Sequence, residues 1–477
     1  MVMARCSWFP WLFLLVVGLA SADAISGSQA VKTTACKLPN LSREVRCGVL
    51  AVAENPDLPG GRQILIHFAI VTASSGKSLP DPIVVLMGGP GEEAIAAADI
   101  YSEEFKALLD ERDLLLVDQR LTGRSAPARC HLYSAAAPAE NLRDFFPPAA
   151  VEKCRQLLQP LVDLTHYTFP DFSRDLEKIR VALGYGPVNL FSGSYGTRAA
   201  QAYLRQFPAS VRTNFLGSPV PIDANPTDFA KTEDTALNLT FDECDNDSAC
   251  HAAFPGIRTE FREVLARLDQ GKVEAAVPGS QERVTLSRGR VVEWLRSKLY
   301  RPKDAAAVPW TIHQAYGGNW SPVVEGILSG FRGADEDLSW GLFFSISCSE
   351  DMPFVSESDI VARSRNTRLG DYRVRQQQAA CREWPKATLP KGYREPIHSD
   401  VPTLIVTGDR DGGTPLWFTD KVAPQFSHEV TVLARGQGHT EWSDCVADLF
   451  TRLVKSGSVA NLQGSVCAPI ATPPFKL

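Results

Sequence analysis

The sequence lacks the features that mark several classes of protein. No Cys-x-x-Cys pair occurs and the eight histidines do not cluster near the cysteines, so no metal site is predicted. No basic block is present, and 49 basic against 55 acidic side chains give a formal net charge of -6. Nucleic-acid binding needs clustered Lys and Arg, so we expect no such partner. With neither repeats nor low-complexity tracts, the composition excludes collagen, coiled coil and disorder.

Long apolar runs are also absent, apart from one near the N-terminus. This run extends from Trp8 to Ala20, follows Arg5, and precedes the small-residue pattern Ala22-Asp23-Ala24. It is too short to span a bilayer of about 30 Å, which favours a signal peptide over an uncleaved anchor helix. We therefore predict a signal peptide over residues 1–24, no membrane span after its cleavage, and a secreted or periplasmic protein.

Cysteine is plentiful by contrast, with 11 residues in the chain. Signal cleavage removes Cys6 and leaves 11 − 1 = 10, and an even number in an exported protein favours disulfides over metal. Proximity along the chain suggests five local pairs: Cys36 with Cys47, Cys130 with Cys154, Cys244 with Cys250, Cys348 with Cys381, and Cys445 with Cys467.

Short apolar, β-branched runs alternate with helical patterns, which is typical of a parallel sheet covered by helices. The expected strands are 63–71, 82–87, 113–117, 188–191, 213–216, 403–407 and 429–433. The stretch between the fifth and the sixth is polar and rich in helical pattern, so it is predicted to be an insertion. We expect an α/β core over residues 25–220 and 400–477, split by an inserted, mostly helical cap domain over residues 221–399.

One strand-to-helix junction carries the pattern of a nucleophile elbow. The predicted strand ending at Phe191 runs into Ser192-Gly193-Ser194-Tyr195-Gly196, and a helix-like stretch follows at once. In hydrolases such a sharp turn lifts a serine above the sheet, and small neighbours keep the turn from clashing. Ser194 is the expected nucleophile. Gly-Ser pairs are common in loops, however, so the elbow needs support from other residues.

A nucleophilic serine requires a histidine base and a carboxylate that orients it. Both occur after late predicted strands: Asp411 in the loop after residues 403–407, and His439 in the loop after residues 429–433. Asp411 is preferred over Asp409, which is closer to its strand and suits a turn-capping role.

The reaction also needs two backbone N–H groups that stabilise an oxyanion. Tyr195 follows the nucleophile and would supply one. Gly89 would supply the other, because Gly88-Gly89-Pro90-Gly91 follows the early predicted strand 82–87. The alternative is that this glycine-rich run is only a turn.

Together, five stretches stand in the order of a known hydrolase pattern. They are Gly88-Gly89-Pro90-Gly91, Asp118-Gln119-Arg120-Leu121-Thr122-Gly123-Arg124-Ser125, Gly193-Ser194-Tyr195-Gly196-Thr197-Arg198, Gly408 to Pro415, and Gly438-His439. The sequence thus resembles the proline iminopeptidase and tripeptidyl aminopeptidase family of secreted serine α/β-hydrolases. Three positions depart from the family pattern: Leu121 and Glu92 stand where Gly is usual, and Met87 where His or Gln is common.

The resemblance implies an α/β-hydrolase fold, no cofactor, and release of N-terminal residues or short peptides from substrates with a free N-terminus. It also implies that acidic groups in a helical cap hold the substrate's ammonium. Glu350 and Asp351 are the expected groups, with Glu92 and Glu93 as rivals. Two alternatives remain: a carboxylic ester hydrolase with the same triad, because fold and triad do not fix the acyl substrate, and an exported binding protein on an inactive hydrolase scaffold.

Overall fold

A nine-stranded sheet forms the centre of the protein. The computed structural model describes residues 31–477, so the predicted signal peptide, residues 1–24, lies outside the described residues. The strands are β1 (Thr33–Cys36), β2 (Val45–Ala53), β3 (Gln63–Val71), β4 (Ile83–Leu86), β5 (Leu114–Val117), β6 (Val188–Gly193), β7 (Val211–Gly217), β10 (Thr403–Gly408) and β11 (Glu429–Ala434). Their order in the sheet is β1-β2-β3-β5-β4-β6-β7-β10-β11.

The sheet is parallel from β5 to β11 and antiparallel where β1, β2 and β3 extend it. Every strand predicted from the sequence is present, and the expected mainly parallel α/β architecture is confirmed. The sequence pattern missed β1 and β2. These edge strands keep many side chains partly exposed, and Gly48 interrupts the apolar pattern of β2.

Alternate residues of the parallel strands enter two separate hydrophobic clusters, because successive side chains of a strand point to opposite faces. Val84 and Leu86 pack on one side of β4, where α4 and α5 cover the sheet. Ile83 and Val85 pack on the other side, beneath α1 and α17. The helices before β7 and after β10 are α1 (Ala98–Glu104), α2 (Pro138–Arg143), α3 (Pro148–Leu158), α4 (Phe169–Ala182), α5 (Gly196–Gln206), α16 (Leu416–Val422) and α17 (Asp444–Ser456).

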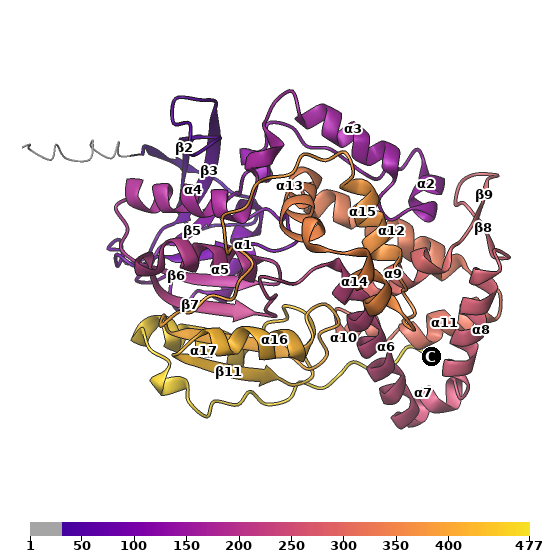
Figure 1. Cartoon of the computed structure of the whole chain (residues 1–477). Helices are drawn as coiled ribbons and strands as arrows, with labels where there is room; N and C mark the ends of the chain where they lie inside the picture. Colours follow the sequence, from indigo (N-terminus) through magenta and orange to yellow (C-terminus); the bar gives the residue numbers. More distant parts are fainter. Residues whose placement is uncertain (1–30) are drawn as a thin grey trace, which may run out of the picture.

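The chain between β7 and β10 is mostly helical and lies to one side of the sheet (Figure 1). It contains α6 (Phe229–Asn246), α7 (Ser248–Ala253), α8 (Ile257–Asp269), the hairpin of β8 (Glu274–Ala276) and β9 (Arg283–Thr285), α9 (Arg288–Lys298), α10 (Pro302–Ala305), α11 (Val308–Tyr316), α12 (Ser321–Asp337), α13 (Trp340–Ile346), α14 (Glu357–Ser364) and α15 (Tyr372–Ala380). The cluster on the α4 and α5 side continues into these helices without interruption. The domain limits at residues 221 and 399 remain a prediction.

Two helices that precede β6 in sequence, α2 and α3, lie beside α12, α13 and α15 (Figure 1). Phe146, between α2 and α3, packs against Phe343 and Phe344 of α13. The hydroxyl of Tyr372 accepts a hydrogen bond from the N–H of Phe145. The helices that follow β7 therefore pack against helices that come before β6 in the sequence.

Five disulfides are present, and their pairings are those predicted from proximity along the chain. Each closes a local loop of the polypeptide. Among residues 31–477, no helix is long and apolar enough to cross a membrane. The last residues return to the helical region, where the N–H of Lys476 donates to the carbonyl of Ala306 and the C-terminus lies beside α11 (Figure 1).

Candidate active site

Ser194 lies at the tight turn between β6 and α5. Its φ is 53°, a left-handed backbone conformation that residues other than glycine rarely adopt. The turn is close enough to the sheet that a Cβ on Gly196 would lie 2.1 Å from the carbonyl oxygen of Leu86. Only glycine fits there, so the sequence pattern and the local geometry agree on an elbow that presents Ser194.

The structure brings together the three residues expected to form a triad. The Nε2 atom of His439 lies 2.8 Å from Oγ of Ser194. On the other side of the ring, Nδ1 lies 2.9 Å and 3.0 Å from the two carboxylate oxygens of Asp411. His439 also donates its backbone N–H to the carbonyl of Tyr300, at 2.7 Å, so a residue just after α9 helps to hold the histidine loop.

Asp411 is buried and receives several hydrogen bonds from its own loop. Its Oδ1 accepts the N–H groups of Gly413 and Thr414, and its Oδ2 accepts the hydroxyl of Thr414. Burial favours the neutral acid, but the nearby imidazole of His439 and these donors outweigh it and lower the pKa of Asp411 below 3.8. The carboxylate is therefore charged at neutral pH and can orient the imidazole.

Asp409 has the turn-capping contact that the sequence suggested as an alternative role. Its Oδ1 accepts the N–H of Gly436 at 2.8 Å, which ties the loop after β10 to the loop after β11. It lies near the histidine loop without contacting the imidazole.

The loop after β4 contributes Gly88 and Gly89 to the lining of the cavity that also contains Ser194. The N–H of Gly88 is used, because it donates to Oε2 of Glu92 at 3.1 Å. Among residues 31–477, no acceptor receives the N–H of Gly89 or that of Tyr195. Gly89 has a φ of 103°, which explains the glycine at this position. Both expected oxyanion donors are thus available in the described part of the chain.

The stretch that begins at Asp118 supports this loop. Asp118 accepts the N–H groups of Ile95 and Arg124, each at 2.9 Å, and so fixes the chain that follows the glycine loop. Gln119 donates to the carbonyl of Met87. Hydrogen bonds from this stretch therefore hold the glycine loop and the chain that follows it in place.

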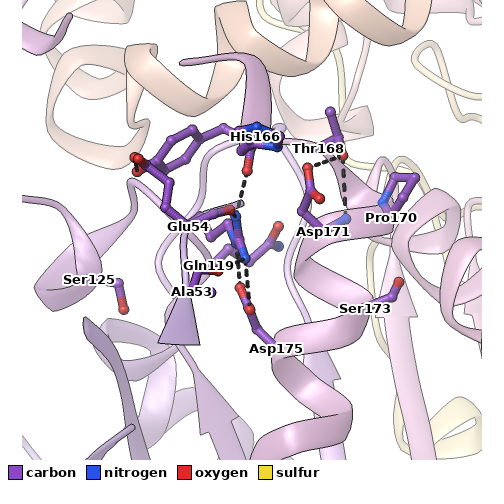
Figure 2. A network of polar contacts seen from close by, with 12 residues as sticks. Ala53, Glu54, Gln119, Ser125, His166, Thr168, Pro170, Asp171, Ser173 and Asp175 are labelled. Carbon is purple, nitrogen blue, oxygen red and sulfur yellow. Dashed lines mark hydrogen bonds and ion pairs between the residues drawn. The ribbon is translucent and has the colours of Figure 1, made fainter. Parts of the chain in front are cut away.

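Arg120, in the same stretch, is fully buried, and Figure 2 labels its partners Ala53, Glu54, His166 and Asp175. Its guanidinium makes a two-point contact with the Asp175 carboxylate and donates to the carbonyls of Glu54, His166 and Ala53. Such a geometry links β2, the loop after β5 and α4 into one rigid block.

Leu121 shows why glycine is usual at its position. Its φ is 63°, in the left-handed region that a branched side chain enters only at a cost of about 1–2 kcal/mol. The buried side chain packs near Gly341 of α13, and the hydroxyl of Ser339 donates to the Leu121 carbonyl. The departure from the pattern is accommodated by contacts to the helical cap region.

The structure does not bring Glu350 and Asp351 to the cavity beside Ser194. They lie on a π-helical turn, Ser347–Asp351, that extends α13 and turns both carboxylates toward α5. Arg198 donates to Asp351 at 2.6 Å and to Glu350 at 3.4 Å, and all three side chains are fully buried. Burial raises the pKa of Glu350 to about 7. These acids join the π-helical turn after α13 to α5, and neither of them lines the cavity.

A cavity of about 440 Å³ lies beside Ser194 and extends under α9 and α12. Glu92 lines it, and burial raises the pKa of this carboxyl despite the Gly88 N–H and the His439 ring, both of which lower it. Glu93, the other rival acid, is paired with Arg129 and is absent from the cavity lining. Within residues 31–477, no group of three or more His, Cys, Asp or Glu side chains could hold a metal ion.

Two contributors to the site were not found by sequence reasoning. Thr414 binds both carboxylate oxygens of Asp411. It follows Asp411 by three residues, after two glycines, and this spacing could have indicated its role from the sequence. Tyr300 lies over the His439 ring, with centroids 4.9 Å apart, but comes from the inserted region. No local pattern marks such a long-range contact.

Two family models match the chain. Residues 81–259 match the alpha/beta hydrolase fold, and residues 366–467 match the TAP-like protein family. Serine protease Hip1 of Mycobacterium tuberculosis is 26% identical over 440 residues, covering 81% of each chain. Tripeptidyl aminopeptidase of Streptomyces coelicolor is 23% identical over 479 residues, covering 91% of this chain and 85% of that one.

Solved structures are similar only at a low level. Proline iminopeptidase of Mycobacterium smegmatis is 13% identical with a TM-score of 0.41, and covers 87% of this chain and 99% of that one. An esterase of Thermogutta terrifontis is 14% identical with a TM-score of 0.37, covering 86% and 99%. Likenesses this weak identify neither activity nor substrate.

The two family models and the curated relatives agree with the resemblance predicted from the sequence. The chain is a serine hydrolase with the α/β-hydrolase fold, and its C-terminal segment matches the TAP-like model.

Proposed function

We propose that the protein is an exported serine exopeptidase that releases N-terminal residues or short peptides by way of an acyl-enzyme. The observation that carries this proposal is the hydrogen-bonded series Ser194, His439 and Asp411 at the wall of a cavity covered by helices. Tripeptidyl aminopeptidase and a serine protease among the curated relatives support a peptide substrate.

In acylation, His439 takes the proton of Ser194 as the serine oxygen attacks the scissile carbonyl. The N–H groups of Gly89 and Tyr195 then stabilise the negative charge that develops on the carbonyl oxygen. Asp411 holds the Nδ1–H tautomer and stabilises the imidazolium. His439 gives its proton to the leaving amine, which departs as the new N-terminus of the shortened peptide.

In deacylation, His439 activates a water molecule that attacks the acyl-enzyme. The same two N–H groups stabilise the second oxyanion, and the proton returns to Ser194 as the released fragment leaves. Apart from the substrate and this water molecule, the scheme uses only groups of the chain.

The substrate's ammonium is best placed beside Glu92. One carboxylate oxygen accepts the Gly88 N–H, and the side chain lines the cavity next to the elbow. Glu350 and Asp351, by contrast, are engaged by Arg198 and lie outside that lining. An ammonium paired with a carboxylate in a water-poor cleft forms a strong charge-assisted hydrogen bond.

Export is the second part of the proposal, and five disulfides support it. Disulfides form and persist in oxidising compartments and are rare in the cytosol. They are compatible with an extracellular or periplasmic protein.

The deciding experiment compares purified wild type with Ser194→Ala on peptide amides, their N-acetylated forms and simple acyl esters. We expect cleavage of free-amine peptides, loss on N-acetylation, and a decrease in kcat on the order of 10⁶-fold in the variant. Mass analysis of the fragments gives the number of residues released. Turnover of esters without peptides would favour the ester hydrolase, and failure to react with a fluorophosphonate probe would contradict both enzymes.

Glu92→Gln tests the ammonium site. The variant should raise KM for free-amine peptides about tenfold or more and leave N-acetylated ester substrates unaffected. An equal rise in KM for both kinds of substrate would show that Glu92 only supports the glycine loop.

A further inference from the structure

One buried cation in the cavity wall has no anionic partner among residues 31–477. Three arginines of α9 and α15, namely Arg290, Arg296 and Arg373, line the cavity and are buried. Arg296 and Arg373 both pair with the carboxylate of Glu293. Arg290, which is 1% exposed, has no ion pair with any carboxylate of the described residues, and its guanidinium makes only one hydrogen bond there, from Nε to the carbonyl of Asn141.

The Nη2 atom of Arg290 is buried without an acceptor among residues 31–477. Leaving a charged donor unsatisfied in a buried site is costly, and burial lowers the pKa of this guanidinium, although arginine still stays charged. An anionic group of a bound ligand would supply the acceptor that this donor lacks.

The guanidinium is also held in a fixed position. It lies 4.0 Å from the ring centroid of Phe331, which stacks at 4.0 Å on Tyr133. Both aromatic residues line the cavity. A donor held by stacking loses little freedom when it binds a ligand, which suits a preorganised subsite.

A second unpartnered donor lies on the same helix. Nε1 of Trp294 is buried without an acceptor in the described chain, and Trp294 also lines the cavity. Residues four apart in a helix share one face, so Arg290 and Trp294 project from α9 side by side.

We propose that Arg290 and Trp294 form a subsite for a carboxylate of the substrate, so that the enzyme prefers acidic peptides. The carboxylate belongs either to an Asp or Glu side chain or to the C-terminus of a short peptide. This inference rests on the proposed function, which supplies a peptide as the substrate, and adds that the peptide carries a carboxylate at this subsite.

The test measures kcat/KM for matched peptides that carry Glu or Gln at each of the first three positions, and for peptides with a free or an amidated C-terminus. We expect a preference of about tenfold or more for the carboxylate in one arm, and that arm identifies its source. Ratios near one in every arm would overturn the proposal.

Arg290→Gln should reduce the preferred ratio to near one, with folding checked by thermal unfolding. The matched control is Arg288→Gln, which removes a partly exposed cation of α9 that pairs with Asp269 outside the cavity and should keep the ratio. A folded Arg290→Gln protein with the wild-type ratio would overturn the proposal. If that variant does not fold, Trp294→Phe keeps an aromatic side chain, although a smaller one, and removes the N–H. An unchanged ratio in that variant would also overturn the proposal.

Nitrophenyl esters with and without a terminal carboxylate separate this inference from the proposed function. A preference for the carboxylate ester that is lost in Arg290→Gln, with no peptide cleaved, would retain the subsite and reject the peptidase. Peptide cleavage without any preference for a carboxylate would retain the peptidase and reject the subsite.

Discussion

Tyr195 donates a hydrogen bond of 2.8 Å from its hydroxyl to Oδ2 of Asp351. Asp351 also pairs with Arg198, whose guanidinium lies over the Tyr195 ring at 5.0 Å. The π-helical turn after α13 is thereby fixed to the first turn of α5. Since the backbone N–H of Tyr195 is the proposed oxyanion donor, an acid of the cap region helps to position it.

Asp351→Asn should therefore reduce stability and kcat. The variant leaves Arg198 without its closest anionic partner in a fully buried site, a loss of about 3–5 kcal/mol. Chemical denaturation measures the stability, and the ratio of activities on free and N-acetylated substrates should stay at the wild-type value. A stable variant that loses this ratio would instead place Asp351 in ammonium binding.

Glu350→Gln should change how stability depends on pH. Burial raises the native pKa of Glu350 from 4.5 to about 7. The native state thus holds a proton that the unfolded chain releases, so this stabilisation is complete below pH 4.5 and is lost as the pH rises through about 7.

The variant keeps the shape of the side chain but cannot titrate, so its denaturation midpoint should vary less than that of wild type between pH 4.5 and 7. The control is Glu325→Gln, at an exposed position of α12, which should follow the wild-type profile. Parallel profiles for Glu350→Gln and wild type would contradict the prediction.

Asp411→Asn should lower kcat by about 10⁴-fold, because an amide that donates to Nδ1 favours the wrong tautomer of His439. Steady-state kinetics and the rate of fluorophosphonate labelling measure the effect. Asp409→Asn is the matched control in the same loop, with its carboxylate bound to the Gly436 N–H, and should retain most activity. Equal losses in the two variants would contradict the assignment.

Gly196→Ala should destabilise the protein by about 3 kcal/mol or more, because the new Cβ would lie 2.1 Å from the Leu86 carbonyl oxygen, which belongs to the sheet and cannot move freely. Gly333→Ala in α12, where nothing lies within 4 Å of the added Cβ, should be neutral or slightly stabilising. Thermal unfolding compares the two. A Gly196→Ala protein as stable as wild type would show that the elbow can rearrange.

The sequence was sufficient where function follows a local pattern. Ser194, Asp411 and His439 each lie in the turn or loop after a strand, and the carboxyl ends of parallel strands meet at one edge of a sheet. Cysteine pairs could be predicted because each closes a short loop. These are properties of neighbours along the chain.

The sequence was insufficient where the outcome depends on how distant helices pack. Glu350 and Asp351 were visible as a pair of acids, but their partner Arg198 lies 152 and 153 residues away in the chain. Arg290 gave no signal, since an arginine in a helix is ordinary until its surroundings are known. Which carboxylates face the cavity is decided by tertiary contacts alone.

The hydrogen bond between Ser194 and His439 joins residues 245 positions apart, and His439 lies close to the end of the chain. During synthesis the serine therefore emerges long before its base. A chain truncated before His439 keeps the elbow but has no base that could activate Ser194.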